Sequence, residues 1–214
     1  MTSAANPAIT HRHLVFHRWR SLSLGIFLML MALVVQTYAS AYVVRTGGNF
    51  VGDIILDNLP IINLSFIYVE CAFLLIIFTT LLVIAKPRYI LFTLKAVAFL
   101  IIIRSFFISV THLGIYPHQI ILDGGFFDRL FIIFDLQAGY FFSGHTAFPL
   151  MMMLIFWREP LWRYFFLIMA FVFGASVLLS HVHYSIDVFA APFMVYSIFK
   201  LAEYWFPGDR ALCS

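Results

Sequence analysis

The stretch FLLIIFTTLLVIAKPRYILFTLKAVAFLIII, residues 73–103, contains two long apolar runs joined by the turn-forming sequence AKPR at 85–88. A helix needs about 20 apolar residues to cross a hydrocarbon core about 30 Å thick. Similar runs occur at 22–44, 61–84, 89–112, 139–157, 161–180 and 183–206. The sequence therefore predicts an all-α polytopic membrane protein, a bundle of six transmembrane helices.

The composition supports this class. Of the 214 residues, 63% are hydrophobic and only 11% are charged, whereas soluble domains have about 25% charged residues. This excludes disordered, collagen-like and disulfide-scaffold proteins. The two cysteines, Cys71 and Cys213, lie far apart and indicate neither a disulfide framework nor a metal cage.

The distribution of basic residues predicts the orientation. With six spans, nine basic residues fall on one side of the membrane and only Arg45 and Arg129 on the other. The positive-inside rule then places both termini in the cytoplasm of a multi-pass protein of the cell membrane. The nine are Arg12, Arg18, Arg20, Lys86, Arg88, Arg158, Arg163, Lys200 and Arg210. Topology explains the net charge of +3 better than binding to nucleic acid does.

This orientation divides the chain into three parts. We expect a basic cytoplasmic segment at 1–21, a membrane-embedded catalytic domain at 22–206 and a short cytoplasmic tail at 207–214. One alternative concerns TYASAY at 37–42, which resembles a signal-peptidase site after an apolar stretch. Cleavage there would leave the remaining orientation unchanged.

Two polar groups begin the fourth and sixth spans, both at the outer face. The first is Ser143-Gly144-His145-Thr146. Ser143 suits an N-cap, Gly144 allows close approach of a ligand, and the first-turn amides of a helix favour phosphate. His145 and Thr146 add further donors. A simple helix cap is the alternative interpretation.

The second group, SHVHYSIDV at 180–188, places His183 and Asp187 four residues apart, on one helical face. A carboxylate beside an imidazole fixes its tautomer and raises its basicity. The alternative is a structural hydrogen bond at a helix end. A zinc site of His145, His181, His183 and Asp187 is a weaker option, because alternate residues on a helix diverge, and we expect no metal and no cofactor.

Arg104 lies about two turns from the outer end of the third span, where an unpaired cation is costly. It is predicted to hold phosphate oxygens, with a salt bridge to Glu70 or Asp187 as the alternative. Lys95, nearer the middle of the membrane, has no predicted role. His112 and His118 are expected to be ordinary interfacial residues.

FSGHT at 142–146 and HYSIDV at 183–188 resemble the two catalytic motifs of sphingomyelin synthases and related lipid phosphotransferases. These enzymes belong to the type 2 phosphatidic acid phosphatase superfamily. GDIILDNLP at 52–60 is similar to a short family motif containing Leu, Asp and Pro, and Arg104 falls where the family carries an arginine.

The resemblance implies a ping-pong reaction at phosphorus. His183, oriented by Asp187, would attack a glycerophospholipid donor, and His145 would protonate the departing diacylglycerol. A ceramide-like or diacylglycerol-like acceptor would then take the phospho-headgroup from His183. The phosphoryl charge would be stabilised by Arg104, Ser143 and the amides around Gly144 and Thr146, and Tyr140 and Tyr184 would contact substrate.

Departures from the family pattern bear on the reaction. Phosphatases of the superfamily carry an arginine where this chain has Val177, and no Arg-Pro pair occurs, which favours a transferase. Sphingomyelin synthases have an acidic residue where this chain has Gly139, so the headgroup stays open. A lipid phosphate or diphosphate phosphatase and a non-catalytic lipid-binding or transport bundle are the two alternatives.

Overall fold

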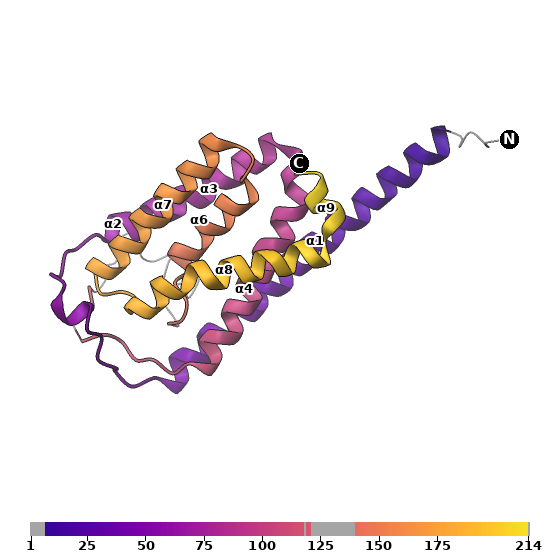
Figure 1. Ribbon diagram of the computed structural model, residues 1–214. Coiled ribbons are helices and arrows are strands. Elements are labelled where there is room, and N and C mark those ends of the chain that lie inside the picture. Colours follow the sequence, from indigo (N-terminus) through magenta and orange to yellow (C-terminus); the bar gives the residue numbers. More distant parts are fainter. Residues whose placement is uncertain (1–6, 118, 121–139, 214) are drawn as a thin grey trace.

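The computed structural model describes residues 7–117, 119–120 and 140–213, with side chains from residue 18 onward, and all regular elements in these ranges are helical (Figure 1). His118, Arg129 and Gly139 lie outside the described residues. The helices are α1 (Pro7–Thr46), η1 (Leu56–Asn58), α2 (Ser65–Tyr68), α3 (Glu70–Ala85), η2 (Pro87–Tyr89), α4 (Ile90–Val110), α6 (Gly144–Ile155), α7 (Pro160–Leu179), α8 (Ser185–Trp205) and α9 (Pro207–Ala211).

Five stretches of helix are long and apolar enough to cross a membrane: Arg18–Thr46, Ser65–Ala85, Pro87–Val110, Pro160–Leu179 and Ser185–Trp205. They correspond to five of the six expected spans and indicate a multi-pass membrane protein. The stretch expected at 139–157 forms only the 12-residue α6. At 1.5 Å per residue α6 is about 18 Å long, too short to cross the bilayer by itself.

Helix α1 is not interrupted at residue 21, where the membrane-embedded domain is predicted to begin. α1 is one continuous helix of 40 residues, and its N-terminal part extends beyond the bundle (Figure 1). The segment at 37–42 lies within this helix.

The two ends of the bundle differ in which helix termini they bring together. α1 packs along α4, and α6 packs against α7 and α8. α1 and α4 finish at the same end of the bundle where α2, α6 and α8 begin (Figure 1). This site end carries both predicted histidine motifs. The cytoplasmic location of the termini stays a prediction.

At the opposite end, Glu159 connects the turn between α6 and α7 to the turn between α3 and α4. It accepts hydrogen bonds from Lys86 at 2.5 Å, from Arg88 at 2.7 Å and from the Tyr89 hydroxyl at 2.9 Å. Burial alone raises the pKa of Glu159, but the hydrogen bonds from Lys86, Arg88 and Tyr89 outweigh it and lower the pKa to about 2. Lys86 and Arg88, two of the nine basic residues predicted to lie on one side, are thus paired with an acid of the next turn at this end.

The C-terminal residues dock onto the bundle through a buried ionic cluster. Lys95 of α4 forms a salt bridge with Asp209 of α9, and the hydroxyl of Ser21 in α1 donates to the same carboxylate at 2.7 Å. All three side chains are buried. Lys95, which had no predicted role, thus connects α1 and α4 with the segment at 207–214 that is predicted to be a short cytoplasmic tail.

Candidate active site

The first polar group forms the N-terminus of α6. Ser143 is the N-cap, and its side chain accepts from the Thr146 backbone N–H at 3.4 Å. Both side chains are buried, Ser143 completely. The prediction of an N-cap is confirmed, and the remaining first-turn amides of α6 stay in place for an anion.

The second polar group forms the N-terminus of α8. His183 Nδ1 lies 3.1 Å from Asp187 Oδ2, and the same oxygen accepts from the Tyr184 backbone N–H at 3.1 Å. A carboxylate only accepts, so Nδ1 carries the proton and the Nε2 lone pair is left available.

The predicted pair is present, but the reason given for it was wrong. His183 precedes the helix, whose N-cap is Tyr184, so the two residues do not share a helical face. Asp187 is the third residue of α8, and its side chain turns back to the chain before the helix, as in a capping box.

The two helix N-termini lie side by side. The Ser143 N–H donates to the backbone carbonyl of Asp187 at 2.9 Å. Gly174 of α7 permits this approach, since a Cβ there would lie 3.2 Å from Val188 and 3.4 Å from the Thr146 hydroxyl. As a result the His145 and His183 rings are 5.8 Å apart between centroids, within reach of one phosphoryl group.

Arg104 of α4 lies over the start of α6. Its Nε donates to the Phe142 carbonyl at 3.0 Å. A Cβ at Gly144 would lie 3.4 Å from Nε and 3.7 Å from Cζ of Arg104, so glycine keeps the guanidinium close to the first-turn amides. The Asp187 carboxylate also attracts Arg104 electrostatically. A cation and two histidines therefore converge at the two helix N-termini.

The two tyrosines beside the motifs have different surroundings. The Tyr140 ring lies 6.0 Å from the His183 ring, and its hydroxyl donates to Gln119 at 2.9 Å. The Tyr184 hydroxyl instead connects two loop segments, donating to the Gly114 carbonyl at 2.9 Å and accepting from the Val51 N–H at 3.4 Å. Substrate contact by either residue stays a prediction.

Asp53 belongs to the site and was not singled out from the sequence. Its Oδ2 accepts from the Ser185 N–H, the first of α8, at 2.6 Å, and its Oδ1 accepts from Ile55 and Leu56. Burial by itself raises the pKa of Asp53, but the hydrogen bonds from Ser185, Leu56 and Ile55 outweigh it, and the pKa lies below its usual value. The only sequence signal was its place in GDIILDNLP, whose second acid, Asp57, accepts from the Tyr116 hydroxyl.

Two backbone positions beside the motifs are strained. Phe141 and His181 have φ angles of +70° and +55°, a region that residues other than glycine rarely adopt and that is enriched at functional sites. The His181 ring packs edge-on against Tyr116 at 5.2 Å. Among the described residues, no three histidines, cysteines or acids are grouped to hold a metal; metal independence itself stays a prediction.

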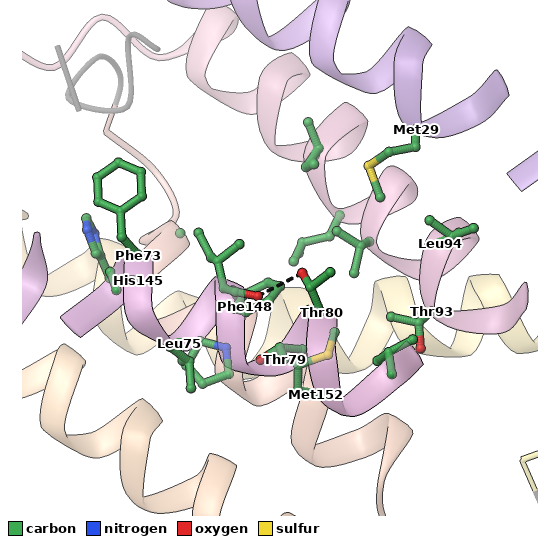
Figure 2. Close-up of a pocket in the computed structure, with 18 of the residues that line it drawn as sticks. Met29, Phe73, Leu75, Thr79, Thr80, Thr93, Leu94, His145, Phe148 and Met152 are labelled. Carbon is green, nitrogen blue, oxygen red and sulfur yellow. Dashed lines mark hydrogen bonds between the residues drawn. The ribbon is translucent and has the colours of Figure 1, made fainter. Parts of the chain in front are cut away.

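An apolar cavity of about 550 Å³ opens onto this site (Figure 2). Its polar end is formed by Gln36, Arg104, Gly144 and His145, and the remaining walls come mainly from apolar side chains of α1, α3, α4 and α6. In Figure 2, His145 lies at one end of the labelled residues and Thr93 at the other.

The cavity has the length of a lipid chain. On α4 it extends from Arg104 down to Ile90, which at 1.5 Å per residue is about 21 Å. An extended chain gains about 1.1–1.2 Å per bond, so about 18 bonds fit. The lining residues Val83, Ile84 and Ile90 lie beside the turn that joins α3 to α4, away from the histidine motifs.

Comparison with known proteins agrees with the geometry. Residues 138–204 match the sequence model described as PAP2 superfamily C-terminal. This match supports the type 2 phosphatidic acid phosphatase superfamily. It covers both histidine motifs, although not α1, α3 or α4, and it supports an activity of the lipid phosphatase or phosphotransferase type. A search of curated proteins and of solved structures gave no match. The match does not distinguish a sphingomyelin synthase-like subtype from other members of the superfamily.

Proposed function

We propose that this protein is a membrane lipid phosphotransferase that moves a phospho-headgroup from a glycerophospholipid to the hydroxyl of a ceramide-like or diacylglycerol-like lipid. The observation that carries the proposal is the apolar cavity that ends at His145, Gly144 and Arg104. It brings a lipid alcohol to the residues that would act on phosphorus. A purely structural polar cluster would not need such an opening.

The first half-reaction uses His183 as nucleophile. Its Nε2 attacks phosphorus while its Nδ1–H keeps the hydrogen bond to Asp187. The bond from phosphorus to the lipid oxygen breaks as the phosphorus–nitrogen bond forms. His145, which lines the cavity, gives its proton to that leaving oxygen. Arg104 and the first amides of α6 stabilise the charge on the phosphoryl oxygens.

The second half-reaction reverses these roles. The released alcohol leaves the cavity and an acceptor lipid enters it. His145, now neutral, takes the proton of the acceptor hydroxyl as that oxygen attacks phosphorus. The phosphorus–nitrogen bond to His183 then breaks, and both histidines return to their initial states. One cavity serves donor and acceptor in turn.

Hydrolysis is the second candidate, with water in place of the acceptor lipid. The observation favouring it is the match of residues 138–204 to a superfamily that includes phosphatases. Both reactions share the first half-reaction and differ only in what attacks the phosphohistidine.

The test is to incubate purified protein with a panel of glycerophospholipids, fluorescent ceramide and fluorescent diacylglycerol. Products are separated by mass, and free phosphate is measured in parallel. A phospho-headgroup on an acceptor, absent with His183→Ala and His145→Ala but present with Glu159→Gln at the opposite end, is expected. Free phosphate from lipid monoesters without transfer would establish the phosphatase instead. No turnover of any lipid phosphate ester would refute both.

A further inference from the structure

Gln36 of α1 lies at the polar end of the cavity, with Arg104, Gly144 and His145. It lies outside the matched residues 138–204 and outside both histidine motifs. The α1 residues that line the cavity are Met29, Leu33 and Gln36, whose spacing of four and three places them on one helical stripe. Because α1 runs toward the site end, Gln36 is the lining residue of this stripe nearest the site.

Hydrogen bonds to two serine hydroxyls hold the Gln36 amide in position between α1 and α4. The Ser105 hydroxyl of α4 donates to Gln36 Oε1 at 3.0 Å, and Gln36 Nε2 donates to the Ser40 hydroxyl at 3.0 Å. Ser40 and Ser105 are buried. Since Ser105 follows Arg104 directly, Gln36 packs against α4 at the level of the Arg104 backbone, and the Gln36 and Arg104 side chains both line the cavity.

This arrangement leaves hydrogen-bonding capacity for a ligand. A glutamine amide has two N–H donors and an oxygen with two lone pairs. One donor and one lone pair are used by Ser40 and Ser105. A polar side chain within a membrane span otherwise bears a cost, which a ligand with a matching polar group would remove.

We propose that Gln36 is a substrate-binding residue that recognises the carbonyl of the ester or amide linkage of the lipid. This inference rests on the proposed function, because it concerns the same lipid. The linkage follows the phosphate-bearing backbone by a few bonds, and the hydrocarbon chain beyond it needs only the apolar walls. The second N–H of Gln36 donates to that carbonyl. The carbonyl would lie where the lining of the cavity changes from polar residues to apolar ones.

The experiment compares two substrates of equal chain length, an acyl-linked lipid phosphate ester and its ether-linked analogue, which lacks the carbonyl. The measured quantity is kcat/KM for the wild type, for Gln36→Met and for Thr37→Val. Thr37 is a matched control, since it is exposed on α1 and its hydroxyl bonds the Leu33 carbonyl of its own helix.

We expect the wild type and Thr37→Val to prefer the acyl substrate by about 3–10-fold, the effect of one hydrogen bond. Gln36→Met should lose that preference and leave turnover of the ether substrate within about twofold of wild type. A wild type that uses both substrates equally would overturn the inference even if the variant failed to fold. An equal loss for both substrates in Gln36→Met would also overturn it, because it would make Gln36 only a bond between α1 and α4. Absence of all turnover would instead refute the proposed function.

Discussion

Replacing Asp187 with asparagine tests the tautomer on which the proposed chemistry depends. Asp187 Oδ2 now accepts from both His183 Nδ1 and the Tyr184 N–H. The asparagine oxygen can keep the bond to Tyr184 and so preserve the helix cap. Its NH₂ group, however, donates where the carboxylate accepted, which favours a proton on His183 Nε2 and removes the nucleophilic lone pair.

The expected effects of Asp187→Asn on stability and on turnover differ greatly in magnitude. Stability should change by less than about 1 kcal/mol because the cap remains, which corresponds to a shift in Tm of at most about 4 °C for a chain of this size. Turnover should fall by a factor on the order of 10⁴, the loss known for the same acid-to-amide change beside a catalytic histidine. At 1.36 kcal/mol per factor of ten this is about 5.4 kcal/mol of activation free energy.

The assay is kcat for transfer or hydrolysis of a lipid phosphate ester by detergent-purified protein, with Tm measured on the same samples. Glu159→Gln is the matched acid-to-amide control, because Glu159 lies at the opposite end of the bundle. If Asp187→Asn keeps its Tm and also keeps turnover within tenfold of wild type, His183 is not a nucleophile oriented by Asp187, and the mechanism is refuted.

Three further predictions concern other parts of the structure. Asp209→Asn should lower Tm by about 6–20 °C, because a buried Lys95 then loses its counter-ion at a cost of about 3–5 kcal/mol; a Lys95→Met/Asp209→Leu double variant that stays as unstable as the single one would contradict this. Glu159 has a folded pKa depressed from 4.5 to about 2, so its contribution to stability is present above pH 4.5 and lost as the pH falls toward 2; the difference in Tm between wild type and Glu159→Gln should shrink over that range, and a difference independent of pH would count against it. Gly144→Ala should fold normally but raise KM about tenfold, which corresponds to the loss of one hydrogen bond to a charged group. The reason is that its methyl would cover the face of Arg104 proposed to bind phosphate. An unchanged KM in steady-state assays would place the phosphate elsewhere.

Five of the six spans could be predicted from the sequence, because the requirement for about 20 apolar residues depends on composition alone. The exception is informative. The stretch 139–157 is as apolar as the others, yet its helix begins only after the Ser143 cap and ends at Ile155. Where a helix starts depends on its cap, and this cap lies beside a residue of a distant helix, Asp187.

The sequence by itself determined that the protein is helical and membrane-embedded, since composition and the length of the apolar runs are sufficient for both. It also predicted His145, His183 and Asp187 as the reacting groups, from residue type and spacing. The tertiary structure decided what those residues meet. The juxtaposition of His145 with His183, the cap that Asp53 provides for α8, the pairing of Lys95 with Asp209 and the cavity beside Gln36 all join positions distant in the chain. Such contacts depend on how helices pack side by side, and no local periodicity encodes which faces will meet.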